Sequence, residues 1–199
     1  LWGLRVRRLG EEGLVLWRHY WDRRKAEQLE RQEWMRRGKL EDEKFIVGCV
    51  PESKVLVDVG CGSARFYPHL KADWYVGCDF SLEMLKLAKK KGSLDLVRCD
   101  AEHLPFKEGL DSILCVDVLR HLPTLKGYNI IKEMLRVASN VVFTIMKSEE
   151  KRVYGDKHER IPSHVANHGF TLNEIKPLLG SRRYRVAFIP PQPPYKEWN

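Results

Sequence analysis

Residues 55–66 constrain the fold of this chain more than any other stretch. The apolar run at residues 55–59 predicts a buried parallel strand, and two glycines at residues 60–62 predict a tight turn directly after it. We expect a helix over residues 63–71 to follow this turn. A strand, a glycine turn and a helix open a nucleotide-binding βαβ unit, because glycines let the backbone approach a ligand closely. The stretch therefore predicts an α/β fold with a ligand site after the first strand.

The residue types around the turn discriminate between cofactors. A dinucleotide fingerprint places a third glycine at position 65, where this chain has Arg65. Asp58 lies two residues before Gly60, and its carboxylate suits a cationic ligand better than a pyrophosphate. A nicotinamide-dependent oxidoreductase stays open as an alternative, and Arg65 argues against it.

Acidic residues also end the next two predicted strands. The strand at residues 74–79 ends in Asp79, 17 residues after Gly62, and the strand at residues 94–100 ends in Asp100. A carboxylate at this distance from the glycine turn accepts hydrogen bonds from ribose hydroxyls in nucleotide-binding folds. Because parallel strands present their carboxyl ends at one edge of a sheet, we expect these acids to line a common ligand crevice.

Three motifs together resemble those of a known enzyme family. D-x-G-x-G begins at Asp58, D-A-x-x-L-P-F begins at Asp100, and a predicted strand at residues 110–117 leads to His121 in an H-L-P ending. The chain is similar in these motifs to the class I S-adenosylmethionine (SAM)-dependent methyltransferases of the UbiE-like group; Ala64 replaces a glycine common in them. The resemblance implies SAM as cofactor and a set of cofactor-binding residues: Asp58, Gly60, Cys61, Gly62, Asp79, Phe80, Asp100, Ala101, Cys115 and Val116.

The resemblance also implies a fold and a chemistry. The fold is a doubly wound, mostly parallel sheet of six or seven strands with helices on both faces. Methyl transfer needs little acid catalysis, so alignment of donor and acceptor supplies much of the rate, and we expect few catalytic side chains. His121 and Asp117 are the candidate general bases. The five Cys form no C-x-x-C motif, so we expect no metal site, and we interpret four of them as small buried apolar residues: Cys61, Cys78, Cys99 and Cys115.

Basic residues concentrate at the two ends of the chain. Residues 1–39 carry 11 Lys and Arg against 6 Asp and Glu, and residues 147–199 carry 10 against 6. We interpret residues 1–50 as a basic, Trp-rich helical lid or extension that includes a helix over residues 14–37. Residues 51–199 are then the SAM-binding domain, with residues 147–180 as an insertion on the acceptor side. The basic ends favour an anionic acceptor such as RNA.

The acceptor stays open between several interpretations. The motif spacing also resembles that of the tRNA wobble-uridine carboxymethyl methyltransferases, which favours tRNA. A small-molecule methyltransferase of the UbiE-like kind and a non-catalytic SAM-binding subunit are the alternatives. A small activator protein is a further partner to consider. No apolar run reaches the length of a membrane helix, no secretion signal precedes the domain and the Cys count is odd, so we expect a cytoplasmic protein with no membrane partner.

The remaining predicted elements are four helices and two strands. The helices cover residues 41–49, 81–91, 126–138 and 171–179, and the strands cover residues 140–146 and 184–189. Ser81 and Thr171 are the predicted N-caps of the second and fourth of these helices.

Overall fold

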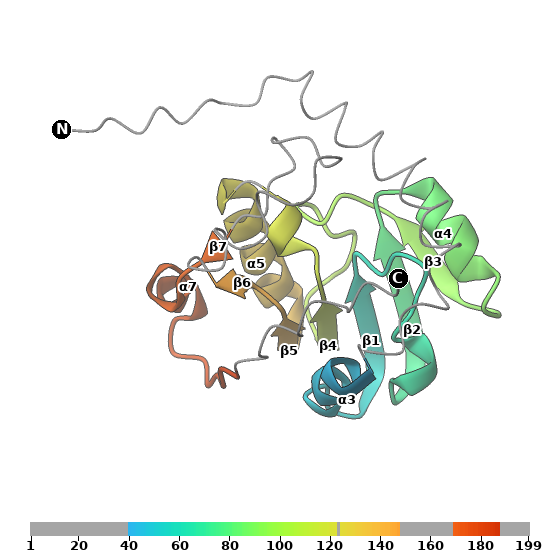
Figure 1. The fold of residues 1–199 in the computed structure, drawn as a ribbon, viewed down its shortest axis with the longest axis horizontal. Helices are drawn as coiled ribbons and strands as arrows, with labels where there is room; N and C mark the ends of the chain where they lie inside the picture. Colours follow the sequence, from blue (N-terminus) through green and yellow to red (C-terminus); the bar gives the residue numbers. More distant parts are fainter. Residues whose placement is uncertain (1–39, 123, 148–168, 188–199) are drawn as a thin grey trace, which may run out of the picture.

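A five-stranded parallel sheet forms the centre of the molecule, and its strand order is β3-β2-β1-β4-β5 (Figure 1). The computed structural model describes residues 40–122, 124–147 and 169–187. The strands are β1 (Ser53–Val59), β2 (Ala72–Asp79), β3 (Asp95–Arg98), β4 (Leu110–Cys115) and β5 (Ala138–Phe143). The strand order reverses at β1, which is where open α/β sheets bind their ligands.

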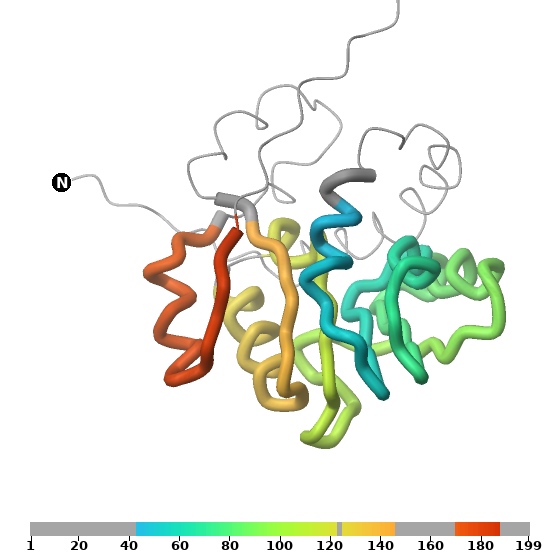
Figure 2. Tube along the Cα trace, turned by 90° about the horizontal axis from the view of Figure 1, so that it is seen from below, coloured from blue at the N-terminus to red at the C-terminus, as the bar shows by residue number. Residues whose placement is uncertain are grey.

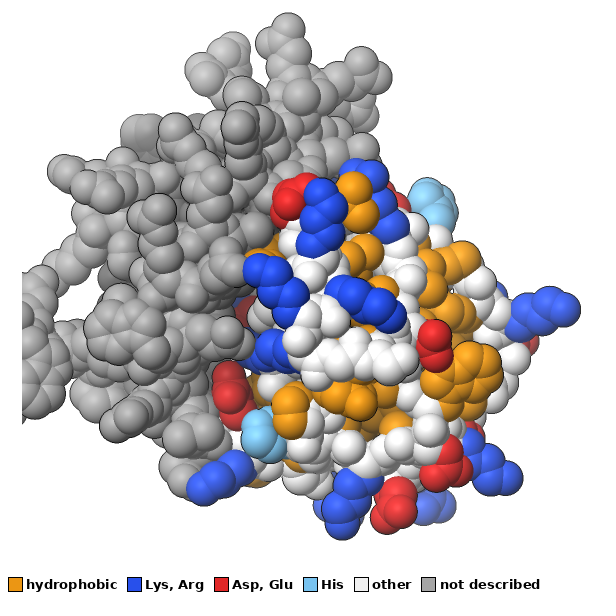
Figure 3. Space-filling model, turned by 90° about the vertical axis from the view of Figure 1, so that its right-hand side faces the viewer, with side chains coloured by type: hydrophobic (Ala, Val, Ile, Leu, Met, Phe, Trp, Pro, Cys, Tyr) orange, Lys and Arg blue, Asp and Glu red, His pale blue; other side chains and the backbone are white. Residues whose placement is uncertain are grey.

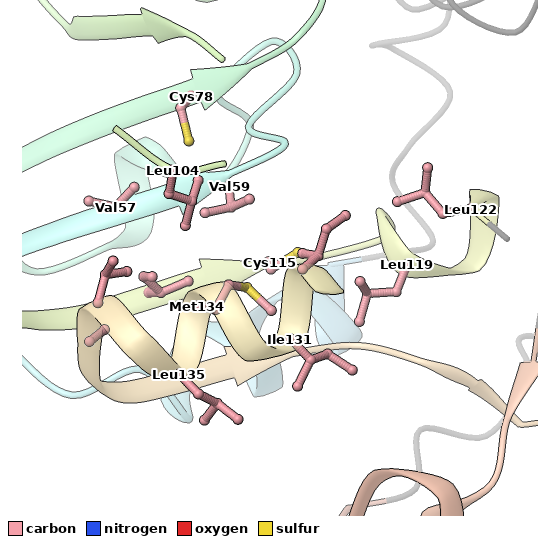
Figure 4. Packing of buried hydrophobic residues seen from close by; sticks show 14 of the residues in the cluster. Val57, Val59, Cys78, Leu104, Cys115, Leu119, Leu122, Ile131, Met134 and Leu135 are labelled. Atoms are coloured by element: carbon pink, nitrogen blue, oxygen red, sulfur yellow. The ribbon is translucent and has the colours of Figure 1, made fainter. Parts of the chain in front are cut away.

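Helices cover both faces of this sheet because its central strands alternate apolar residues between the two faces. Val57 and Ile113 belong to a buried cluster with Ile131 and other residues of α5 (Thr124–Val137), and Figure 4 shows part of this cluster. On the other face, Leu56 packs with Ala88 of α4 (Leu82–Lys89). The third helix, α3 (Leu40–Gly48), packs on that same face. Its Ile46 joins a buried cluster with Leu114 and Val116 from the end of β4. The predicted class, a parallel sheet with helices on both faces, is confirmed; this sheet has five strands among the described residues, against the six or seven predicted.

A second, smaller sheet lies beside α5. Strands β6 (Met146–Lys147) and β7 (Gly169–Phe170) pair in parallel, and α7 (Leu172–Leu179) follows with the predicted Thr171 capping box. Phe170 packs so closely on α5 that a Cβ at Gly127 would lie 2.4 Å from its Cζ. In Figure 2, α7 (red) lies at the opposite end of the described structure from α4 (green).

Two of the predicted elements are wrong. Residues 63–71 form turns and one short 3₁₀ helix, η3 (Tyr67–His69), instead of an α-helix. Pro68 explains this, because it disfavours the helical conformation at the residue before it, and Ala64 has a positive φ of 54°. The predicted strand at residues 184–189 is irregular and exposed over residues 184–187, which the structure describes.

The other predicted helices are confirmed within one or two residues at each end as α3, α4, α5 and α7. Most of the predicted lid at residues 1–50, including its helix over residues 14–37, lies outside the described residues. The same holds for residues 148–168 of the predicted insertion. None of the helices that the structure describes is long and apolar enough to span a bilayer.

Candidate functional site

The glycine turn after β1 alternates left-handed residues and is anchored to β2. Gly60, Gly62 and Ala64 have φ values of 69°, 55° and 54°. The backbone N–H groups of Gly60 and Cys61 both donate to the carbonyl oxygen of Cys78, at 2.7 and 3.0 Å. Ala64 therefore adopts a conformation that glycine reaches more easily, which explains why glycine is common at this position of the motif.

Space also restricts the turn, strictly at Gly60 and less at Gly62, where the nearest atom is the end of a flexible Met side chain. A Cβ at Gly60 would lie 2.2 Å from Cγ2 of Val118, and a Cβ at Gly62 would lie 2.9 Å from Cε of Met84. Val118 follows β4 and Met84 lies in α4, so the turn packs between two elements that belong to different parts of the sheet edge. Any side chain at Gly60 would push this turn away from β4.

Asp79 connects the glycine turn to the second strand and to α4. One carboxylate oxygen accepts the N–H of Gly62 and the other accepts the N–H of Ser81, each at 2.9 Å. Ser81 in turn caps α4 by accepting the N–H of Met84 at 3.2 Å. These bonds fix the orientation of the Asp79 carboxylate between the glycine turn and the start of α4.

The remaining predicted acids have different environments. Asp100 is half-buried just after β3 and accepts the N–H of Glu102 at 3.1 Å, which fixes its orientation in a local turn. Asp58 is buried at the end of β1, where the hydroxyl of Tyr75 donates to it at 2.8 Å. Burial raises the pKa of Asp58 to about 7, although the Tyr75 hydrogen bond and the positive charge of Arg65 act in the opposite direction.

A chain of ion pairs joins α3, the segment after the glycine turn and the segment after β4. The guanidinium of Arg65 lies 2.9 Å from Asp117 and 3.6 Å from Glu43 of α3, and Arg120 lies 3.4 Å from the other oxygen of Asp117. Asp117 has a positive φ of 60°, and its N–H donates to the hydroxyl of Thr144 at 2.9 Å. Two cations therefore hold the Asp117 carboxylate in one orientation. Sequence reasoning missed this chain, because residues 43, 65 and 117 show no common spacing or motif.

The other predicted site residues lie around the ends of β2, β3 and β4. Phe80 and Ala101 are half-buried directly after Asp79 and Asp100. His121 is half-buried in η4 (Leu119–His121), the short 3₁₀ helix after β4. Cys115 and Val116 are buried on opposite faces of the sheet, Cys115 toward α5 and Val116 toward α3. The structure thus brings the predicted residues to the carboxyl edge of four neighbouring strands.

The fold and the acidic residues at its carboxyl edge can now be compared with known proteins. Residues 57–142 match the family model described as "Methyltransferase domain". Solved structures with the same fold include methyltransferases, among them one with bound S-adenosylhomocysteine. Residues 57–142 therefore resemble a methyltransferase domain, and the sheet has the fold of solved methyltransferases.

Particular relatives narrow the comparison. A tRNA (carboxymethyluridine(34)-5-O)-methyltransferase of Arabidopsis thaliana is 31% identical over 107 residues, which cover 51% of this chain and 26% of that protein. The magnesium protoporphyrin IX methyltransferase of Synechocystis superposes with a TM-score of 0.67 at 19% identity, covering 83% of this chain and 87% of that one. A putative methyltransferase of Haloferax volcanii, in complex with the Trm112 methyltransferase activator, has a TM-score of 0.62 at 16% identity, over 81% and 73% of the chains. The chain spans about a quarter of the length of the first curated relatives it matches.

Proposed function

We propose that this chain transfers a methyl group from SAM to tRNA. The observation that carries the proposal is the Asp79 carboxylate, which hydrogen-bonds to the N–H groups of Gly62 and Ser81 and so joins the glycine turn to the ends of β1 and β2. This unit lies where the strand order reverses, the position at which open parallel sheets bind nucleotides.

The residues present fit SAM by shape and by charge. Gly60 and Gly62 have positive φ values and let the turn pack closely against Val118 and Met84, which holds its backbone at the edge of the sheet where the ligand would bind. The acids Asp58, Asp79 and Asp100 stand at the ends of three adjacent strands, and together they suit a ligand with a cationic amino group, a sulfonium and ribose hydroxyls. Asp58, two residues before Gly60, suits the pyrophosphate of a dinucleotide poorly.

The chain's own residues bind and orient, and their chemistry is limited. When bound, SAM supplies a methyl group attached to a positively charged sulfur. This sulfur becomes a neutral thioether when the methyl group is transferred, so the leaving group needs no acid catalysis. Asp79 would hold the ribose and Asp100 with Ala101 the adenine, so that the methyl group points at the acceptor. Holding the two reactants in line can contribute up to ~7–11 kcal/mol in the best intramolecular cases. His121 is the proposed general base for an acceptor that carries a proton.

Asp117 is better suited to positioning than to accepting a proton. Its carboxylate lies in ion pairs with Arg65 and Arg120, and both pairs stabilise the negative form. A carboxylate acceptor, like that of the reaction named for the Arabidopsis relative, needs no strong base. We therefore propose that Asp117 orients Arg65 and Arg120 beside the acceptor.

The tRNA acceptor is supported by the relative's name and by the distribution of charge. The chain has a formal net charge of +8. Exposed basic side chains at α4 and β3 include Lys86, Lys89, Lys90 and Arg98, and Figure 3 shows Lys and Arg side chains over that end of the molecule. Such a surface attracts phosphates and makes binding dependent on salt. We further propose a small activator protein as partner, as in the Haloferax complex, and a cytoplasmic site of action, where tRNA is modified.

The test is methyl transfer from labelled SAM to separate pools of tRNA, rRNA and small-molecule extract, with and without a Trm112-type activator. We expect label in the tRNA pool, and an affinity for tRNA that falls steeply as salt rises. Asp79→Ala should abolish the transfer. Asp73→Ala is the matched control, because it changes an exposed acid of the same strand. Label found only in small molecules, or tRNA affinity that does not change with salt, would rule out the RNA acceptor.

A further inference from the structure

The segment between β3 and β4, residues 99–109, carries two of the proposed ligand residues, Asp100 and Ala101. It forms turns and irregular backbone. A turn closes at its start, where the N–H of His103 donates to the carbonyl oxygen of Asp100 at 2.9 Å. Leu104 then enters the main buried cluster, as Figure 4 shows. Such a segment is held in place by its contacts with other elements rather than by a ladder of sheet hydrogen bonds.

Helix α5 supplies such contacts through Glu133 and Arg136, which lie about one turn apart. The carboxylate of Glu133 accepts the N–H of Leu104 at 3.1 Å, and the guanidinium of Arg136 donates to the carbonyl oxygen of Phe106 at 3.2 Å. Arg136 also orients Glu133, because its Nε and one Nη donate to the two carboxylate oxygens at 2.9 and 2.7 Å. The hydrogen bonds from Arg136 keep the pKa of Glu133 below its ordinary value, so a charged carboxylate accepts the N–H of Leu104.

A second contact runs from this segment to the first half of α5. Glu102 pairs with Nζ of Lys126 and accepts a hydrogen bond from the side-chain amide of Asn129 at 3.0 Å. The Glu102 side chain is only 14% exposed, so this contact is better shielded from water than an ion pair on the open surface. The backbone N–H of the same residue donates to the Asp100 carboxylate at 3.1 Å. The orientation of Asp100 is therefore linked to α5 through one residue, Glu102.

We propose that Glu133 and Glu102 are positioning residues that make the ligand site selective for an adenine base. They fix residues 99–109 on α5, and the fixed segment presents the Asp100 carboxylate as an acceptor for the exocyclic amino group of adenine. Hypoxanthine carries an oxygen in place of that amino group, so it places an acceptor opposite a carboxylate that can only accept. This inference rests on the proposed SAM site, and it adds two residues that act on the ligand through the segment rather than by touching it.

The test compares S-adenosylhomocysteine with S-inosylhomocysteine, its analogue with hypoxanthine as base, by isothermal titration of the full chain. The wild type should bind the adenine compound roughly 10- to 100-fold more tightly, the usual effect of a hydrogen bond to a charged group. Glu133→Ala should weaken binding of the adenine compound and leave binding of the hypoxanthine compound nearly unchanged, so that the ratio of the two affinities falls toward one. Glu133→Gln should keep most of the ratio, because its amide oxygen can still accept the N–H of Leu104.

Glu83→Ala is the matched control, because Glu83 pairs with Lys86 three residues later on α4, as Glu133 pairs with Arg136 on α5, and both of its partners in that pair are exposed. It should leave both affinities unchanged. Urea unfolding of each variant measures the folded fraction present in the titration. If Glu133→Ala does not fold, Glu102→Ala provides the same test, since its side chain lies on the segment itself and should lower the ratio in the same way.

The outcomes separate this inference from the proposed function. An equal loss of affinity for both compounds in Glu133→Ala and Glu102→Ala would mean that the two carboxylates only stabilise the fold, and this would overturn the proposal. A wild type that binds both compounds equally well would also overturn it, while a SAM site as such would stand. A folded wild type that binds neither compound would instead refute the proposed function.

Discussion

Gly60→Ala is the substitution for which the structure gives the most specific expectation. Gly60 has a φ of 69°, which alanine adopts only with strain, and the added Cβ would lie 2.2 Å from Cγ2 of Val118. The left-handed conformation costs about 1–2 kcal/mol for a residue with a Cβ. The steric overlap forces Val118 and the turn apart, which adds ~1–3 kcal/mol, the usual cost of overpacking. We therefore expect Gly60→Ala to lower the free energy of unfolding by about 2–5 kcal/mol.

Two further variants separate the conformational cost from the steric cost. Gly180 also has a positive φ, 58°, with a ψ of −131°, and a Cβ at this residue would meet nothing within 4 Å, so Gly180→Ala should cost only the backbone strain, about 1–3 kcal/mol. Combining Gly60→Ala with Val118→Ala removes the overlapping methyl group and should recover part of the steric cost. Urea unfolding of the wild-type chain and these three variants measures each free energy. A Gly60→Ala protein no less stable than Gly180→Ala would refute this reasoning about the turn.

Two other expectations concern charge. Burial raises the pKa of Asp58 to about 7, so the folded chain binds a proton at this carboxyl more readily than the unfolded chain does. The free energy of unfolding of the wild type should therefore fall as pH rises toward 7 and stay level at higher pH. Asp58→Asn lacks this proton, so its free energy of unfolding, measured in urea, should rise by about 2–3 kcal/mol relative to that of the wild type between pH 5 and 7. A difference between the two proteins that does not change with pH would contradict the raised pKa. Arg65→Met removes the cation beside Asp117 and beside a buried oxygen of Glu43 and should cost about 1–3 kcal/mol, whereas Lys86→Met, which breaks an exposed pair, should cost under ~0.5 kcal/mol. Equal losses of stability in these two variants would mean that the ion pairs of Arg65 contribute no more than an exposed surface pair.

The strands and the acids at their ends were predictable because both signals are local. A short apolar run followed by Asp79 or by Gly60 carries its strand and its turn in consecutive residues. The parallel order then places these residues at one edge without further information. The predicted N-caps at Ser81 and Thr171 were correct for the same reason.

The elements that failed depend on the surroundings of the residues. Residues 63–71 have an apolar pattern that suits a helix, but Pro68 and the left-handed Ala64 prevent one. Arg65 was interpreted only as evidence against a dinucleotide, whereas the structure places it between Glu43 and Asp117. Such long-range pairing follows from the packing of α3 and the end of β4 around the turn, which no spacing in the sequence encodes.

The central claim is that the carboxyl edge of the sheet binds SAM, and isothermal titration of the chain with SAM tests it most directly. NAD is the alternative ligand, and Asp79→Ala is the control protein. The account predicts binding of SAM at micromolar concentration, strong weakening by Asp79→Ala, and no heat with NAD. Binding of NAD as tight as that of SAM, or SAM affinity that Asp79→Ala leaves unchanged, would contradict the assignment of the carboxyl edge of β1, β2 and β3 as a SAM site.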